Sequence, residues 1–158
     1  MSYLLDTNIF IRSKNELPMD IYQGFWQRLA ELAQEGQIFS SVKVKEEIDR
    51  GNDELKQWCE DKLPNEFFLP FEAHVEYAHL MTWANDNPVF SVPAKQEFAT
   101  VADAYLVSTA SALGMTVVTY ETSDPLCKKR VKIPDACIVL GVEYCSLNEV
   151  FHALNVVI

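Results

Sequence analysis

The sequence has no long apolar run and no segment typical of targeting. Among its 158 residues, no apolar stretch reaches the roughly 18 residues that a membrane-spanning helix needs. The N-terminus has no basic region followed by an apolar one, which a secretory signal would have. We therefore expect a cytoplasmic protein with no membrane partner.

Paired cysteines are also missing. The four cysteines, Cys59, Cys127, Cys137 and Cys145, stand far apart and form no Cys-x-x-Cys motif. Their spacing argues against both a zinc site of the usual kind and a disulfide framework. We expect buried free thiols.

Basic residues are few. The chain has 13 Lys and Arg against 23 Asp and Glu, a formal net charge of -10. This balance argues against a protein that binds nucleic acid through a broad basic surface. It does not exclude a nuclease, because carboxylates that hold divalent cations add to the negative total. An acidic surface also suits a basic protein partner.

Apolar periodicity divides the chain into alternating strands and helices, which is typical of an α/β fold with a parallel sheet. No repeat, linker or low-complexity segment interrupts it, so we expect one domain over residues 1–158. The predicted strands are 3–8, 37–41, 67–69, 115–119 and 143–146. The predicted helices are 21–36, 42–50, 53–62, 74–83, 97–114, 134–141 and 148–154, the last capped by Asn148. The middle section is interpreted as a helical insertion beside the sheet.

The first strand ends in a carboxylate. Three apolar residues, Tyr3, Leu4 and Leu5, precede Asp6 directly, as in a buried strand of a parallel sheet. Ligands of open α/β sheets bind beyond the carboxyl ends of the strands, so Asp6 is a candidate site residue. Alternatively, Asp6 only N-caps the following helical segment.

Three further carboxylates occupy comparable places. Glu121 follows the strand predicted at 115–119, and Glu47 and Asp103 lie at the inner edges of helices that follow strands. Such positions converge in a doubly wound sheet. Clustered acids repel one another unless a cation joins them, and oxygen ligands suit Mg²⁺ or Mn²⁺. This chemistry is typical of metal-assisted phosphodiester hydrolysis. Taken alone, Glu47 is more typical of a solvated helix charge.

The sequence resembles the PIN-domain family of ribonucleases, which includes the toxins of VapBC-type toxin–antitoxin pairs. Four segments carry the resemblance in order: YLLDTNIFI, SSVKVKEEI, ATVADAYLVSTA and TVVTYET. RVKIPDAC, followed by a closing strand and helix, is similar to a bacterial branch of PIN-like proteins. The resemblance implies a PIN-like three-layer α/β/α fold with a central parallel sheet.

The resemblance also implies the site. The metal-binding and catalytic acids of the family fall on Asp6, Glu47 and Asp103, and Asn8 matches a polar residue that lines the site. The fourth motif departs from the pattern, since Glu121 stands where the family usually has Asp, and Asp124 follows three residues later. Either of these two acids, or neither, is the fourth carboxylate.

A run of cations follows the fourth motif and has two interpretations. Lys128, Lys129, Arg130 and Lys132 either contact the phosphates of a substrate or belong to a solvated loop. The resemblance implies a Mg²⁺- or Mn²⁺-dependent endoribonuclease, a hydrolase acting on an RNA substrate. It also allows an antitoxin partner and a homodimer. The alternative is a catalytically silent PIN-like protein that acts by binding a protein or RNA partner.

Overall fold

The fold is built on a parallel sheet. A computed structural model describes residues 2–51 and 53–158, so residues 1 and 52 of the predicted domain lie outside the described part. The strands follow the order β3-β2-β1-β4-β5, and all their pairings are parallel. They are β1 (Tyr3–Leu5), β2 (Ile38–Ser41), β3 (Phe68–Leu69), β4 (Thr116–Val118) and β5 (Tyr144–Cys145).

Strand β1 lies at the centre of the sheet. Its residues Leu4 and Leu5 are completely buried, since a central strand covered by helices on both faces contacts no water. From β1 the chain passes through two helices to β2 on one side, whereas β4 pairs with β1 on the other side. The direction of strand order therefore changes between β1 and β4, where ligand crevices of open α/β sheets form.

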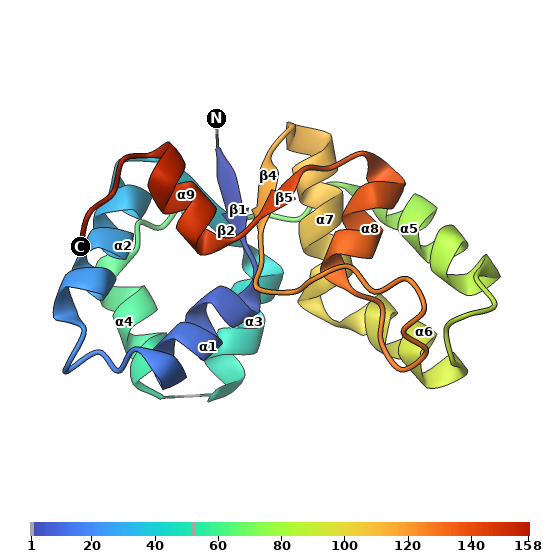
Figure 1. Ribbon diagram of the computed structural model, residues 1–158, viewed down its shortest axis with the longest axis horizontal. Coiled ribbons are helices and arrows are strands. Elements are labelled where there is room, and N and C mark those ends of the chain that lie inside the picture. The colour runs from blue at the N-terminus through green and yellow to red at the C-terminus, as the bar shows by residue number, and fades with distance from the viewer. Residues whose placement is uncertain (1, 52) are drawn as a thin grey trace.

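Helices cover both faces of the sheet. Figure 1 shows α1, α2, α4 and α9 on one side of the sheet and α5, α6, α7 and α8 on the other. Their bounds are α1 (Thr7–Glu16), α2 (Gln23–Gln34), α3 (Val42–Gly51), α4 (Glu54–Lys62), α5 (His74–Asp86), α6 (Val92–Thr100), α7 (Ala102–Leu113), α8 (Ile133–Leu140) and α9 (Leu147–Ala153). Helix α3 packs against both α1 and α7. The predicted three-layer α/β/α fold with a central parallel sheet is confirmed.

The amphipathic pattern of α2 explains how it packs. Phe25, Leu29 and Leu32 point into the core, as their helical spacing predicts. Ile21, which fits the same spacing, lies outside α2 and is 69% exposed. The predicted start of this helix was therefore too early, because Pro18 and the residues after it form turns before the helix begins.

The predicted helix 97–114 is in fact two helices. Val101 has extended backbone (φ -81°, ψ 163°), which ends α6 and begins α7. Helix α6 begins earlier than predicted, because the Ser91 hydroxyl accepts a hydrogen bond from Ala94 N at 3.2 Å and Pro93 favours the first turn. The break places Asp103 in the first turn of α7, so its predicted position near a helix start is confirmed.

The predicted cap of the last helix was also wrong. Helix α9 is capped by Ser146 and not by Asn148: the Ser146 hydroxyl accepts from Glu149 N at 3.2 Å, and the Glu149 carboxylate accepts from Ser146 N at 2.7 Å. This reciprocal pair is a capping box. The short strand predicted at 67–69 is confirmed as β3, which extends the sheet at the edge of β2.

The described part of the chain contains no helix with the length and apolar character needed to cross a membrane.

Candidate active site

Asp6 lies at the carboxyl end of β1 and is 2% exposed. Its carboxylate accepts a hydrogen bond from the backbone N–H of Asn8 and another from the Thr119 hydroxyl at 2.7 Å. Asp6 is thus both a strand-end acid, as predicted, and the N-cap of α1, which was the alternative. Burial raises the pKa of Asp6 to about 6, against the opposing effect of its hydrogen bonds.

Asp103 is the second buried acid, in the first turn of α7. Its pKa is raised to about 7, first by burial and then by the negative charges of Asp6 and Glu121. The pKa of Asp6 is likewise raised by Glu121. The structure therefore brings Asp6, Asp103 and Glu121 together beyond the ends of β1 and β4, where they repel one another.

Glu121 is tied to both the acids and the following loop. Its Oε2 accepts a hydrogen bond from Arg130 Nη2 at 2.9 Å, and the same nitrogen lies 3.3 Å from Asp103 Oδ2. The other Glu121 oxygen accepts from Ile133 N at 3.2 Å, at the start of α8. Glu121 thus connects the end of β4, the Arg130 loop and the N-terminus of α8, where a carboxylate is favourable.

Glu47 is not a solvated helix charge, because both of its carboxylate oxygens are engaged. Oε1 accepts from the Thr7 hydroxyl at 2.6 Å, and Oε2 accepts from Ala102 N at 3.0 Å. Those donors begin helices α1 and α7, each of which also carries or adjoins one of the buried acids. Glu47 therefore fixes the two helix starts beside Asp6 and Asp103.

The remaining predicted residues are placed differently. The Asp124 side chain is exposed, and the backbone N–H of Asp124 donates to Asp135 Oδ2 at 3.0 Å. Asn8 is half-buried, and its backbone N–H donates a hydrogen bond to the Asp6 carboxylate. The roles of both residues toward a metal or a substrate stay predictions.

Asp6 and Asp103 are the buried acids of this site that could hold a hard cation. Within residues 2–51 and 53–158, no three His, Cys, Asp or Glu side chains are arranged so that together they could hold a metal ion. Mg²⁺, however, is commonly held by one or two carboxylates and keeps several of its own waters. The repelling pair of Asp6 and Asp103 has this chemistry. Their ligand roles, like that of Glu47, stay predictions.

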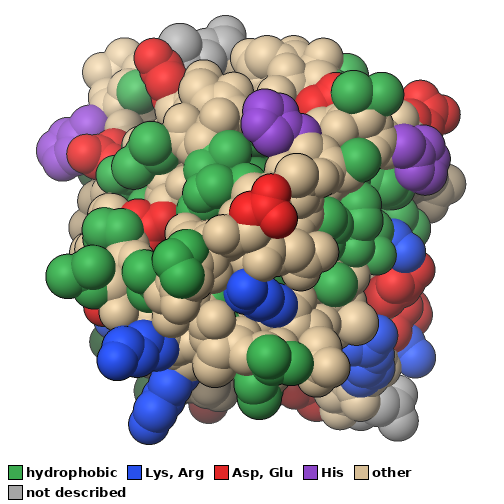
Figure 2. All heavy atoms as spheres, turned by 90° about the vertical axis from the view of Figure 1, so that its right-hand side faces the viewer, with side chains coloured by type: hydrophobic (Ala, Val, Ile, Leu, Met, Phe, Trp, Pro, Cys, Tyr) green, Lys and Arg blue, Asp and Glu red, His purple; other side chains and the backbone are tan. Residues whose placement is uncertain are grey.

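Arg130 connects the basic run to the acids. Lys128 and Lys129 are exposed, and Arg130 and Lys132 are half-buried. Of the four, only Arg130 takes part in an ion pair within the described residues. Figure 2 shows that Lys and Arg side chains on this face lie mostly in its lower half, at the level where Figure 1 places α6 and the loop that follows β4.

Sequence reasoning missed three supporting residues. Thr119 and Thr7 hold Asp6 and Glu47 through their hydroxyls. Asp135, only 6% exposed, accepts from the Ser123 hydroxyl and from Asp124 N at 3.0 Å, which closes the loop after β4. Thr119 follows an apolar strand directly and Asp135 stands in the first turn of α8, but neither signal distinguishes these residues from ordinary capping residues.

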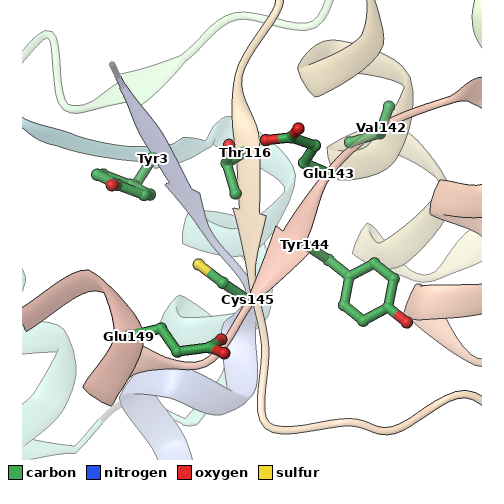
Figure 3. Close-up of a pocket in the computed structure, with 7 residues that line it drawn as sticks. All are labelled: Tyr3, Thr116, Val142, Glu143, Tyr144, Cys145 and Glu149. Atoms are coloured by element: carbon green, nitrogen blue, oxygen red, sulfur yellow. The ribbon is translucent and has the colours of Figure 1, made fainter. Parts of the chain in front are cut away.

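A cavity of about 450 Å³ lies elsewhere in the molecule. Figure 3 shows that side chains from β1, β4, β5, α9 and the segment before β5 line it: Tyr3, Thr116, Val142, Glu143, Tyr144, Cys145 and Glu149. Tyr3 and Thr116 begin strands that end beside Asp6 and Thr119. The cavity runs from the starts of β1 and β4 along β5 to Cys145 and Glu149, and its lining includes none of the candidate site residues.

Comparisons with solved structures find the same fold in three complexes. The crystal structure of VapBC2 from Rickettsia felis bound to a DNA fragment from their promoter has a chain that is 20% identical, with a TM-score of 0.54, over 92% of this chain and 98% of that one. The structure of FitAB bound to an IR36 DNA fragment has a chain that is also 20% identical (TM-score 0.53; 91% and 94% covered). FitAcB from Neisseria gonorrhoeae is 19% identical (TM-score 0.50; 90% and 95% covered).

These similarities confirm the fold that the sequence motifs imply. A search of curated proteins finds no match. A family model described as Domain of unknown function (DUF4411) matches residues 3–158. The chain therefore belongs to the DUF4411 family, whose match covers nearly the whole sequence, and it has a PIN-like fold.

Proposed function

We propose that the protein is a metal-dependent endoribonuclease that hydrolyses phosphodiester bonds of RNA. The observation that carries the proposal is the group of acids at the switch point of the sheet, of which Asp6 and Asp103 are buried and Glu121 is half-buried. Burying mutually repelling carboxylates without metal is costly, and proteins keep such arrangements chiefly where they serve a function.

The reaction requires a cation, a water molecule and an anchored phosphate. Mg²⁺ or Mn²⁺ bound at Asp6 and Asp103 would supply Lewis acidity to the phosphate and lower the pKa of water. In the hydrolysis, the water oxygen forms a new bond to phosphorus, one phosphodiester P–O bond breaks, and a proton from water ends on the released oxygen. Glu47 would hold the starts of α1 and α7 so that both acids keep their positions.

We further propose that the protein acts as the toxin of a toxin–antitoxin pair. The support is the shared fold over nearly the full length of the VapBC2 and FitAB chains. The net charge of -10 makes a basic segment of the partner electrostatically favourable. Coexpression with the product of a neighbouring gene, followed by copurification, tests the proposed partnership.

A cleavage assay tests the enzyme proposal. Purified protein is incubated with total RNA in Mg²⁺ or Mn²⁺, and a parallel sample contains EDTA. We expect fragments that form only with the metal and only from wild-type protein. An Asp20→Asn variant is a matched control, because Asp20 is exposed and remote in sequence from the motifs, and it should cleave like wild type.

A second candidate function follows from the contacts of the acids. Arg130 already donates hydrogen bonds to Asp103 and Glu121. Both carboxylate oxygens of Glu47 already accept a hydrogen bond. A catalytically silent protein that binds a protein or RNA partner would have the same contacts. This second candidate predicts binding of RNA or of a protein partner, with no RNA cleavage in Mg²⁺ or Mn²⁺.

The fourth motif gives an ordered prediction. Glu121→Gln should lower the cleavage rate by about 10- to 100-fold, the range for residues that position metal ligands. The substitution weakens the hydrogen bonds from Arg130 and from Ile133 N. Asp124→Asn should have little effect, since its carboxylate is exposed. Initial rates at saturating metal decide the order. A larger loss in the Asp124 variant would make the loop residue the fourth acid.

The basic run gives a prediction about salt. If Lys128, Lys129 and Lys132 contact phosphates, replacing all three with Ala weakens RNA binding and flattens its dependence on salt. Each lost contact should reduce the slope of log K against log salt by about 0.7. Fluorescence anisotropy with a labelled RNA, in Ca²⁺ to suppress cleavage, measures the slope. An unchanged slope identifies the run as a solvated loop.

A further inference from the structure

Arg130 spans two of the acids with a single nitrogen. Its Nη2 lies 2.9 Å from Glu121 Oε2 and 3.3 Å from Asp103 Oδ2. The side chains of these carboxylates are only 10% and 12% exposed, whereas that of Arg130 is 38% exposed. A guanidinium group therefore lies between two acids and supplies the positive charge that a second metal ion could otherwise bring there.

The surroundings favour this cation strongly. Burial lowers the pKa of Arg130, but the charges of Glu121, Asp103 and Glu97 more than offset this effect and hold it above its usual value. The crevice that Arg130 lines with Asp103 and Glu97 is too narrow for a water molecule. A second divalent cation at this point would have to displace Arg130 or be repelled by it.

The loop that carries Arg130 is anchored on both sides. Ser91 N donates to the backbone oxygen of Lys128 at 2.9 Å, and Glu121 accepts from Ile133 N at 3.2 Å. The guanidinium is thus fixed before any ligand binds, which is the condition for effective electrostatic stabilisation of a transition state.

Arg130 also keeps donors for a ligand. Both of its ion pairs use Nη2, and across residues 2–51 and 53–158 no protein acceptor bonds its Nε or Nη1. A guanidinium has five N–H donors in a planar fork that matches two phosphate oxygens. The part of the side chain that is exposed can therefore bind a phosphate while Nη2 stays on the acids.

We propose that Arg130 takes the place of a second metal ion and donates hydrogen bonds to a phosphate oxygen of the substrate beside a one-metal centre at Asp6 and Asp103. This inference rests on the proposed nuclease function. Arg130 stabilises the negative charge that grows on the phosphate oxygens as water adds and the P–O bond breaks. It is then a catalytic residue and not only a member of a basic surface.

The number of bound ions tests the proposal without relying on activity. Wild-type protein is titrated with Mn²⁺, and the electron paramagnetic resonance signal of free Mn²⁺ measures how much is bound. We expect one bound ion per chain. Arg130→Gln removes the charge between Asp103 and Glu121, and a second ion should then bind. Arg130→Lys keeps the charge, so its count should stay at one. Thermal melts of each variant verify folding.

Cleavage kinetics supply the second readout. Arg130→Gln should lower kcat by about 100-fold, the typical loss for one transition-state donor, and Arg130→Lys should recover part of it. Arg50→Gln on the exposed end of α3 is the control and should match wild type.

Three results would overturn the proposal: two Mn²⁺ ions bound to wild-type protein, an unchanged count in a folded Arg130→Gln protein, or a rise in kcat when Arg130 is removed. A rise in kcat would mean that Arg130 blocks the site. A wild-type protein that cleaves no RNA contradicts the proposed nuclease function, whereas the Mn²⁺ counts still decide whether Arg130 occupies the position of a second ion.

Discussion

Replacing Asp103 with Asn should abolish RNA cleavage and at the same time stabilise the metal-free protein. Replacing a residue that only holds a metal ligand in place lowers metal affinity or activity by about 10- to 100-fold. Losing a direct ligand should therefore lower the cleavage rate by more than about 100-fold. Asn has nearly the same shape as Asp, and Arg130 keeps its ion pair with Glu121. The fold should therefore persist.

The gain in stability has an electrostatic reason. Asp103 is buried and faces Asp6 and Glu121, and its pKa is raised to about 7. Above that pH the wild-type protein carries an unfavourable buried charge that the Asn variant lacks. The free energy of unfolding should rise by about 1–3 kcal/mol at pH 8 and by much less at pH 5. Urea unfolding at both pH values measures this change.

Asp20→Asn is again the matched control, with no change expected in activity or in the free energy of unfolding. An inactive Asp103→Asn protein that is also less stable at pH 8 would contradict this account. Its Asp103 would then be a structural partner of Arg130 before anything else.

Metal-free wild-type protein should lose stability as the pH rises from 4 to 8. The pKa values of Asp6 and Asp103 in the folded protein are about 6 and about 7, above the ordinary value of 3.8. Between the ordinary and the raised values the folded state binds more protons than the unfolded state, so each increment of pH favours unfolding. The loss should amount to roughly 3–6 kcal/mol in total.

The metal should reverse this trend. Mg²⁺ or Mn²⁺ binds the ionised acids of the folded state, so a saturating concentration should raise the free energy of unfolding at pH 8 and have little effect at pH 4. A protein carrying both Asp6→Asn and Asp103→Asn should show a flat pH profile and no response to metal. If wild type also has a flat profile between pH 4 and 8, the two acids do not carry the raised pKa values.

The local patterns of the sequence largely determined which segments form strands and helices. The apolar run before Asp6 predicts a buried central strand, and the spacing of Val44 and Ile48 predicts the buried face of α3. These signals are local, since they depend on side chains a few residues apart. The predicted helix boundaries were less accurate where a turn or a capping residue sets the end of the helix, as at Ile21, Val101 and Ser146.

The sequence by itself also predicted which acids form the candidate site, through their places after strands and through four motifs that resemble the PIN-domain family. Only the tertiary structure decided what those acids contact. Glu47 bonds two helix starts 40 and 55 residues away, and Arg130 reaches back 27 residues to Asp103. No local period encodes such pairings, because they arise when the chain crosses over between parallel strands and brings distant loops to the same edge of the sheet.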